Sequence, residues 1–144
     1  MSTVKRVGAE EARRLIEIEG HAYVDVRTVE EFDAGHPEGA YNVPIALSGP
    51  MGMQPNGDFV AVMERTFAKD ARIVVGCKMG GRSLRAAEAL VAAGFSNVVD
   101  QRAGFDGARD PFGRLTEPGW RPAGLPVATK AADGRSWAEL RTKK

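Results

Sequence analysis

The sequence predicts a single α/β domain with a largely parallel β-sheet. Short apolar runs alternate along the chain with segments of helical periodicity, and this alternation is typical of strand–helix–strand units. The 144 residues, 43% of them hydrophobic, suffice for one compact core. We find no internal repeat and no second domain in the sequence.

The first half of the chain begins this alternation. Ala12, Leu15 and Ile16 recur at helical spacing, and Thr28 with Glu31 three residues later forms a capping-box pattern that opens a short helix. The predicted elements are an edge strand at 4–7, a helix at 9–18, a buried strand at 21–26, the short helix after Thr28, a strand at 40–43 and a Gly- and Pro-rich loop at 48–58.

The second half contains the clearest strand. Ile73, Val74 and Val75 form a β-branched run that we expect in the middle of the sheet. The predicted elements are a helix at 59–67, a strand at 72–76, a helix at 81–93 that ends at Gly94, a strand at 97–100 and a short terminal helix at 136–141 capped by Ser136. The segment 101–126 is rich in Gly, Pro and Arg and has no clear assignment.

The composition argues against several classes of partner. The formal net charge is +1, so no broad basic surface for nucleic acid or an anionic membrane is expected. The apolar runs are far shorter than the roughly 20 residues of a membrane span. Residues 1–20 are charged and lack the apolar stretch of a signal peptide. We therefore expect a soluble, cytoplasmic protein.

The single cysteine, Cys77, has two interpretations. It cannot form an internal disulfide, and His21 and His36 lie too far apart in the sequence to suggest a metal site, so no metal is expected. A lone cysteine is either a small buried hydrophobe or a reactive thiol. The residues around it decide between these two.

The segment that follows the predicted strand at 72–76 favours the reactive thiol. It lies where a strand meets a helix, at the carboxyl end of the sheet where α/β folds place their sites. The helix N-terminus, two glycines that let backbone N–H groups turn inward, and two cations all stabilise a thiolate. The residues concerned are Lys78, Met79, Gly80, Gly81, Arg82 and Ser83.

The same surroundings suit a persulfide, in which one extra sulfur is bonded to the cysteine. Because the chain has no second cysteine to resolve it, that sulfur has to leave to an external acceptor. This favours a double-displacement reaction over dithiol redox cycling, and it requires no cofactor.

The segment 77–83 resembles the active-site loop of the rhodanese superfamily. The resemblance extends in order through 23–27 (Tyr-Val-Asp-Val-Arg), 30–32, 35–36, 39–44 and 123–127, so that it covers most of the chain. It is greatest to small single-domain members of bacteria and plants. It implies a rhodanese-like domain at 1–127, with about five strands flanked by helices on both faces, followed by a C-terminal tail at 128–144.

The resemblance also assigns residues. It implies that Cys77 is the nucleophile that accepts sulfur, that the backbone of 78–83 cradles this sulfur, and that Arg82 braces the loop. For Asp25 and Arg27 it implies a mainly structural role, which we read as an ion pair at the strand end rather than a part in the chemistry. His36 is interpreted as a hydrogen-bonded structural residue rather than a general base.

Loop length separates the branches of the superfamily. Four residues lie between Cys77 and Arg82, the shorter spacing that the resemblance associates with sulfur transfer, whereas the related cell-cycle phosphatases have five. The sequence departs from the family where Pro37 follows His36. It also departs at 109–118, an insertion that separates Ala103-Gly104-Phe105 from Trp120.

The hypotheses for function are therefore ranked. The first is an enzyme that moves sulfur from thiosulfate or a similar donor through Cys77 to cyanide or a thiol. The second is a sulfur carrier or partner-binding module loaded by a cysteine desulfurase, and the least favoured is a phosphatase or arsenate reductase.

Besides small-molecule donors and acceptors, a sulfur-relay protein or a thioredoxin-like thiol is a candidate partner. Lys78 is the candidate side chain for meeting thiosulfate, while Met51 and Met53 either line the mouth of the site or pack under a loop.

Overall fold

The computed structural model describes residues 4–142 and contains one five-stranded sheet, in the order β1-β8-β7-β2-β4, with every neighbouring pair parallel. The predicted α/β class and parallel sheet are confirmed. The β-branched run lies on the central strand, as predicted, because it is buried on both faces. The strands are β1 (Lys5–Val7), β2 (Ala22–Asp25), β4 (Tyr41–Asn42), β7 (Arg72–Gly76) and β8 (Asn97–Gln101).

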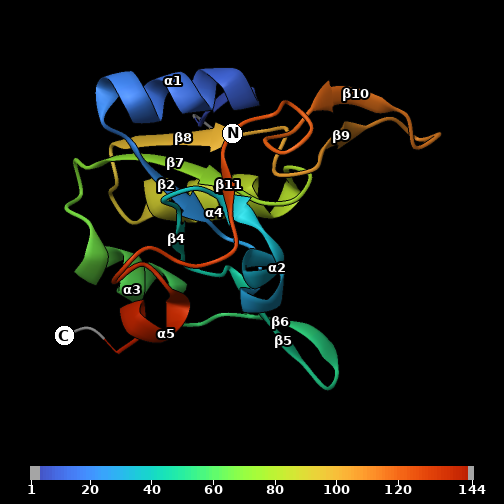
Figure 1. Cartoon of the computed structure of the whole chain (residues 1–144). Coiled ribbons are helices and arrows are strands. Elements are labelled where there is room, and N and C mark those ends of the chain that lie inside the picture. Colours follow the sequence, from blue (N-terminus) through green and yellow to red (C-terminus); the bar gives the residue numbers. More distant parts are fainter. Residues whose placement is uncertain (1–3, 143–144) are drawn as a thin grey trace.

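Helices cover both faces of this sheet (Figure 1). On one face α1 (Ala9–Glu19) packs Ala12 and Leu15 into a cluster that also contains Tyr23 and Val74. On the other face lie α3 (Phe59–Thr66), α4 (Gly81–Ala92) and α5 (Trp137–Leu140), which share a second cluster with inward residues of β2 and β7. The remaining helix, α2 (Val29–Ala34), begins at the predicted capping box of Thr28 and Glu31.

Two hairpins extend from the body on the side where β7 and β8 end (Figure 1). The segment 48–58, predicted to be a loop, is largely the hairpin of β5 (Ala46–Gly49) and β6 (Gly52–Pro55), so that prediction is wrong. Its sequence lacks the apolar alternation of a half-buried strand, because this hairpin stands in solvent and is held by backbone pairing. The unassigned segment contains a second hairpin, β9 (Gly107–Arg109) and β10 (Leu115–Pro118), which accounts for most of the insertion.

The end of the chain packs back onto the domain. The two-residue strand β11 (Val127–Ala128) pairs with β3 (His36–Pro37), and α5 is capped by the Ser136 hydroxyl as predicted. Trp137 and Leu140 are buried in the cluster that also contains residues of α3 and α4. Within residues 4–142, none of the helices combines the length and apolar character that crossing a membrane requires.

Candidate active site

The register of the sheet places Cys77 between two other strand ends. Asp25, Gly76 and Gln101 lie side by side as the last residues of β2, β7 and β8. The N–H of Val26 donates to the carbonyl of Gly76 at 2.9 Å, so the pairing continues to the residue before the cysteine. Cys77 therefore leaves the sheet at its centre, between neighbours that fix the start of the loop.

A closed ring of hydrogen bonds surrounds the Cys77 sulfur. The N–H of Gly80 donates to Sγ at 3.1 Å, the thiol donates to Oγ of Ser83 at 3.5 Å, and that hydroxyl donates to the carbonyl of Gly80 at 3.3 Å. Cys77 is only 1% exposed, so the sulfur lies at the bottom of the loop. A cavity of about 530 Å³ opens above it, lined also by Met79, Gly81 and Arg85.

Gly80 is required by the shape of this loop. Its φ of +104° lies in the left-handed region, and a Cβ there would collide with the carbonyl oxygen of Arg102. Gly80 caps the N-terminus of α4, and Gly81 is the first residue of that helix. The turn that brings the Gly80 amide to the sulfur thus depends on a residue without a side chain.

Arg82 does not point its charge at the sulfur. Its two terminal nitrogens donate to the two oxygens of Glu31 at 2.6 and 2.9 Å, which joins α4 to the capping box of α2. Partial burial opposes the charged form of Glu31, but the hydrogen bonds from Arg82 and Thr28 prevail and lower the pKa of Glu31 to about 2. Arg82 therefore braces the loop through a partly buried ion pair.

Asp25 and Arg27 form a buried ion pair beside the loop. The guanidinium donates to both carboxylate oxygens, with a shortest distance of 2.7 Å, and also to the carbonyl of Gly35 at 2.6 Å. It lies 4.4 Å from the centre of the Phe105 ring. Asn42 donates to the carbonyls of both Asp25 and Arg27, so Asn42 and the ion pair together hold the chain between β2 and α2.

Lys78 lies beside Asp106 and Arg121. Its ammonium group is 3.9 Å from Oδ2 of Asp106, while Arg121 is 3.5 Å from Oδ1 of the same carboxylate. The Lys78 side chain is half exposed. Lys78, Phe105 and Arg121 line a recess of about 420 Å³ that reaches Arg27.

Arg6 of β1 also holds the loop. Arg6 donates through Nε to Asp100 at 2.7 Å and through a terminal nitrogen to the carbonyl of Gly80 at 3.4 Å. Burial raises the pKa of Asp100, although hydrogen bonds to the carboxylate oppose the shift. Arg6 thus connects the edge strand β1 to the turn that holds the sulfur.

His36 is set apart from the sulfur site by its contacts. It is fully buried, its ring stacks on Phe32 with 3.6 Å between centroids, and its Nδ1 lies 2.7 Å from the Phe32 carbonyl.

Met79 is 55% exposed above the cavity. Met53 contacts Arg82 through sulfur at 3.7 Å, whereas Met51 is 87% exposed near the tip of the β5–β6 hairpin.

Sequence reasoning missed the contribution of the segment after β8. The N–H groups of Phe105 and Asp106 donate to the carbonyls of Cys77 and Lys78 at 2.7 and 3.0 Å. Trp120 returns to this segment by donating its N–H to the carbonyl of Gly104, so the insertion is closed at its base. The Ala103-Gly104-Phe105 pattern was the available signal, but it did not reveal this contact with the loop.

Comparison with known proteins identifies this arrangement. The family model described as "Rhodanese-like domain" matches residues 8–110, which is more than half of the chain. The chain belongs to the rhodanese family. The matched region includes the loop 77–83 and both partners of the Arg82–Glu31 ion pair.

Curated relatives of this rhodanese-like chain include plant proteins. It is 46% identical over 86 residues to "Thiosulfate sulfurtransferase 16, chloroplastic" of Arabidopsis thaliana, covering 60% of this chain and 72% of the relative. It is 38% identical over 104 residues to "Thiosulfate sulfurtransferase 18" of the same plant, covering 71% and 76%. The match to the Raphanus sativus protein DIN1 is 41% identical but covers only 47% of that relative.

Solved structures share the fold over nearly the whole chain. The crystal structure of Rv0390 from M. tuberculosis superposes with a TM-score of 0.73 at 26% identity, over 90% of this chain and all of that one. A thiosulfate sulfurtransferase from Pseudomonas aeruginosa superposes with a TM-score of 0.62 at 20% identity, over 92% of this chain and 21% of that one. The second likeness concerns the fold alone.

Proposed function

We propose that this rhodanese-like protein is a sulfurtransferase that moves a sulfane sulfur from thiosulfate, or a similar donor, to cyanide or a thiol. In the first step the Cys77 thiolate attacks the outer sulfur of thiosulfate. The sulfur–sulfur bond of the donor breaks, sulfite leaves with the bonding electrons, and Cys77 becomes a persulfide. In the second step an acceptor such as cyanide attacks the outer sulfur, leaves as thiocyanate and restores the thiolate.

The ring of hydrogen bonds around Cys77 carries this proposal. An amide N–H that already contacts Sγ stabilises negative charge on the sulfur, and the Ser83 hydroxyl can turn to donate to a thiolate. Neither step needs a general base once the thiolate is present, and the site offers Lys78 at its rim for an anionic donor. The names of two curated relatives, thiosulfate sulfurtransferases, support the same choice of donor.

The phosphatase alternative is disfavoured by the size of the loop. With four residues between Cys77 and Arg82, one amide reaches the sulfur, and the Arg82 guanidinium is held by Glu31 rather than turned toward a bound anion. A tetrahedral phosphate needs donors around three oxygens. The same chemistry with a protein acceptor is the sulfur-carrier alternative, and steady-state turnover with small molecules alone separates the two.

An intact-mass measurement tests the proposal. After treatment with thiosulfate, the wild-type protein should gain the mass of one sulfur atom, and cyanide should remove it. Cys77→Ser should remain folded, because the side chains are similar in size, but should take up no sulfur. A folded Cys77→Ser variant that still transfers sulfur would refute a mechanism through Cys77.

We also propose the cytoplasm as the compartment. A reducing environment suits a protein whose chemistry needs a free thiol, and Cys77 is unpaired. Fractionation of the source cells, with detection of the protein by antibody, tests this. Recovery of the protein in an oxidising compartment would overturn it.

A further inference from the structure

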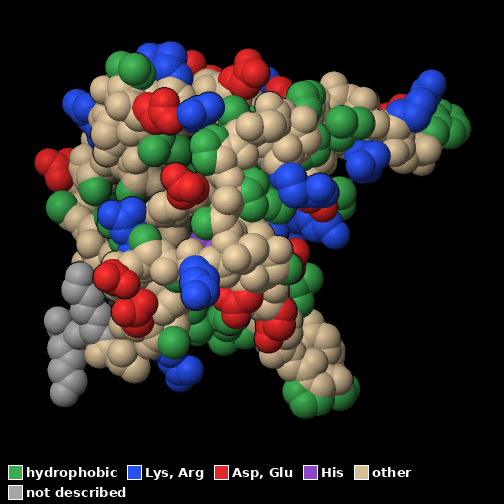
Figure 2. All heavy atoms as spheres, in the orientation of Figure 1, with side chains coloured by type: hydrophobic (Ala, Val, Ile, Leu, Met, Phe, Trp, Pro, Cys, Tyr) green, Lys and Arg blue, Asp and Glu red, His purple; other side chains and the backbone are tan. Residues whose placement is uncertain are grey.

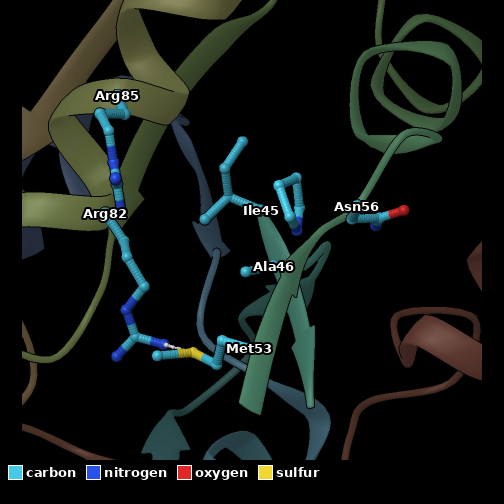
Figure 3. A pocket seen from close by; sticks show the side chains of 7 residues that line it. Ile45, Ala46, Met53, Asn56, Arg82 and Arg85 are labelled. Carbon is cyan, nitrogen blue, oxygen red and sulfur yellow. Dashed lines mark hydrogen bonds between the residues drawn. The ribbon is translucent and has the colours of Figure 1, made fainter. Parts of the chain in front are cut away.

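A second cavity continues the space above Cys77 toward the β5–β6 hairpin (Figure 3). Its volume is about 510 Å³, and it shares Arg82 and Arg85 with the cavity over the sulfur. In Figure 3, Arg82 and Arg85 come from α4 on one side, and Ile45, Ala46 and Met53 face them from the other. The two cavities therefore adjoin at Arg82 and Arg85, and together they are here called the hairpin groove; Cys77 lines the part over the sulfur.

The walls of the hairpin groove are mainly apolar and anchored at the base. Ile45, Ala46 and Pro55 line it, and Asn56 ties the end of the hairpin to the Pro44 carbonyl at 2.8 Å. Met53 and Met79, which flank the groove, are 57% and 55% exposed. Exposed flexible methionines beside a site are suited to contact with another protein. The volume of the groove also exceeds the volume that thiosulfate or cyanide would occupy.

The charge in the groove is positive. Arg82 is neutralised by Glu31, but Arg85 is exposed and has no carboxylate partner within residues 4–142. Lys78 lies at the other end of the cavity over Cys77 and shares Asp106 with Arg121. Figure 2 shows Lys and Arg side chains gathered between the two projecting hairpins. An occupant of this groove is therefore favoured if it carries a carboxylate.

We propose that the hairpin groove binds an extended segment of an acceptor protein, in which a cysteine is flanked by an apolar residue and an acidic residue. The apolar side chain lies among Ile45, Ala46 and Met53, and the carboxylate pairs with Arg85. This inference rests on the proposed function. The acceptor thiolate attacks the outer sulfur of the Cys77 persulfide, the bond to Sγ breaks, and its electrons return to Cys77 as a thiolate. The acceptor cysteine leaves as the persulfide, so no oxidant or reductant is consumed.

Short synthetic peptides with one cysteine serve as the probe. One has leucine and glutamate beside the cysteine, a second has lysine in place of glutamate, and a third has serine in place of leucine. Protein preloaded with sulfur is mixed with each peptide, and the rate of loss of sulfur is followed by intact mass. Each rate is divided by the rate with 2-mercaptoethanol, a thiol too small to span the groove. This division corrects for any change in the reactivity of the Cys77 persulfide itself.

We expect the glutamate peptide to react about fivefold faster than the lysine peptide at low salt, as for one exposed ion pair, and faster than the serine peptide. Arg85→Glu should reverse the preference between glutamate and lysine, and Arg85→Ala should abolish it. Arg72→Glu makes the same charge change at the opposite end of β7 and should leave the preference as in the wild type. Arg85→Ala keeps the test available if the charge reversal does not fold.

Two outcomes would overturn the inference, and they differ in what else they overturn. Equal normalised rates for the three peptides, or a preference that Arg85→Glu leaves unchanged, would refute docking in the hairpin groove and leave sulfur transfer intact. A wild-type protein that takes up no sulfur from thiosulfate or from inorganic polysulfide would refute the proposed function and this inference together.

Discussion

Removing the charge of Glu31 isolates the ion pair that braces the active loop. In the wild type the Thr28 N–H donates to Oε1 of Glu31 at 3.1 Å. Glu31→Gln keeps a side-chain oxygen that accepts this bond, so the capping box of α2 survives. What is lost is the charge opposite Arg82, whose two nitrogens lie 2.6 and 2.9 Å from the carboxylate. The variant therefore reports the ion pair and not the helix cap.

The size of the effect follows from the pKa of Glu31. The shift from 4.5 to about 2, part of which comes from the hydrogen bonds of Thr28, corresponds to at most about 3.5 kcal/mol, at roughly 1.4 kcal/mol for each pH unit. The Glu31 side chain is 28% exposed, and solvent screening reduces the contribution to the free energy of unfolding to about 2 kcal/mol. Glu11→Gln is the control, because Glu11 pairs with Arg14 with similar geometry on the exposed surface of α1, and its effect should be small.

Urea unfolding at several pH values provides the assay. Because the folded pKa of Glu31 is depressed, its contribution is fully present above about pH 4.5 and is lost as the pH falls toward 2. The gap between wild type and Glu31→Gln should therefore be widest near neutrality and narrow below pH 4.5. Equal unfolding midpoints at pH 7, or a gap that widens in acid, would refute the reasoning.

Three further predictions concern the loop and its support. Lys78→Ala should lower kcat/KM for thiosulfate, with a loss of about 1–2 kcal/mol in transition-state stabilisation, and should affect an uncharged persulfide donor less. Equal losses for both donors in steady-state assays would mean that Lys78 only supports the loop. Gly76→Ala should lower the free energy of unfolding by about 2–3 kcal/mol, because its Cβ would collide with the Tyr23 hydroxyl. Tyr23→Phe should recover part of that loss in thermal melts, and a Gly76→Ala variant as stable as wild type would contradict the collision. One glycine inserted between Gly80 and Gly81 should reduce sulfur transfer by orders of magnitude in a protein that still melts cooperatively, and full activity would contradict the argument from loop length.

The sequence was sufficient to predict features that depend on local pattern. The strand at 72–76 is recognisable because three β-branched residues follow one another, and the capping box because Thr28 and Glu31 stand at the required spacing. The position of Cys77 at a strand end followed from the same local reading. These features depend on residues that are neighbours in the chain, so no tertiary information was needed.

Features that depend on distant contacts were not predictable in this way. Glu31 and Arg82 are 51 positions apart, and each had a separate local interpretation, as a helix cap and a loop residue. The β5–β6 hairpin stands in solvent, and no buried face imposes an alternation of apolar residues on its sequence. The contact of Phe105 with the Cys77 carbonyl forms only when the chain turns back after β8.

The tethers of the active loop bear on where specificity resides. Arg82 is held by Glu31 of α2, the Gly80 carbonyl by Arg6 of β1, and the Cys77 carbonyl by the N–H of Phe105. Three parts of the chain thus hold the loop that surrounds the sulfur, so the loop has little freedom to adapt its shape to different substrates. Discrimination between donors and acceptors must then come from what surrounds the fixed sulfur. The side chains that can provide it are the exposed or half-exposed ones at the rims, Lys78 toward the charged recess and Arg85 toward the hairpin groove.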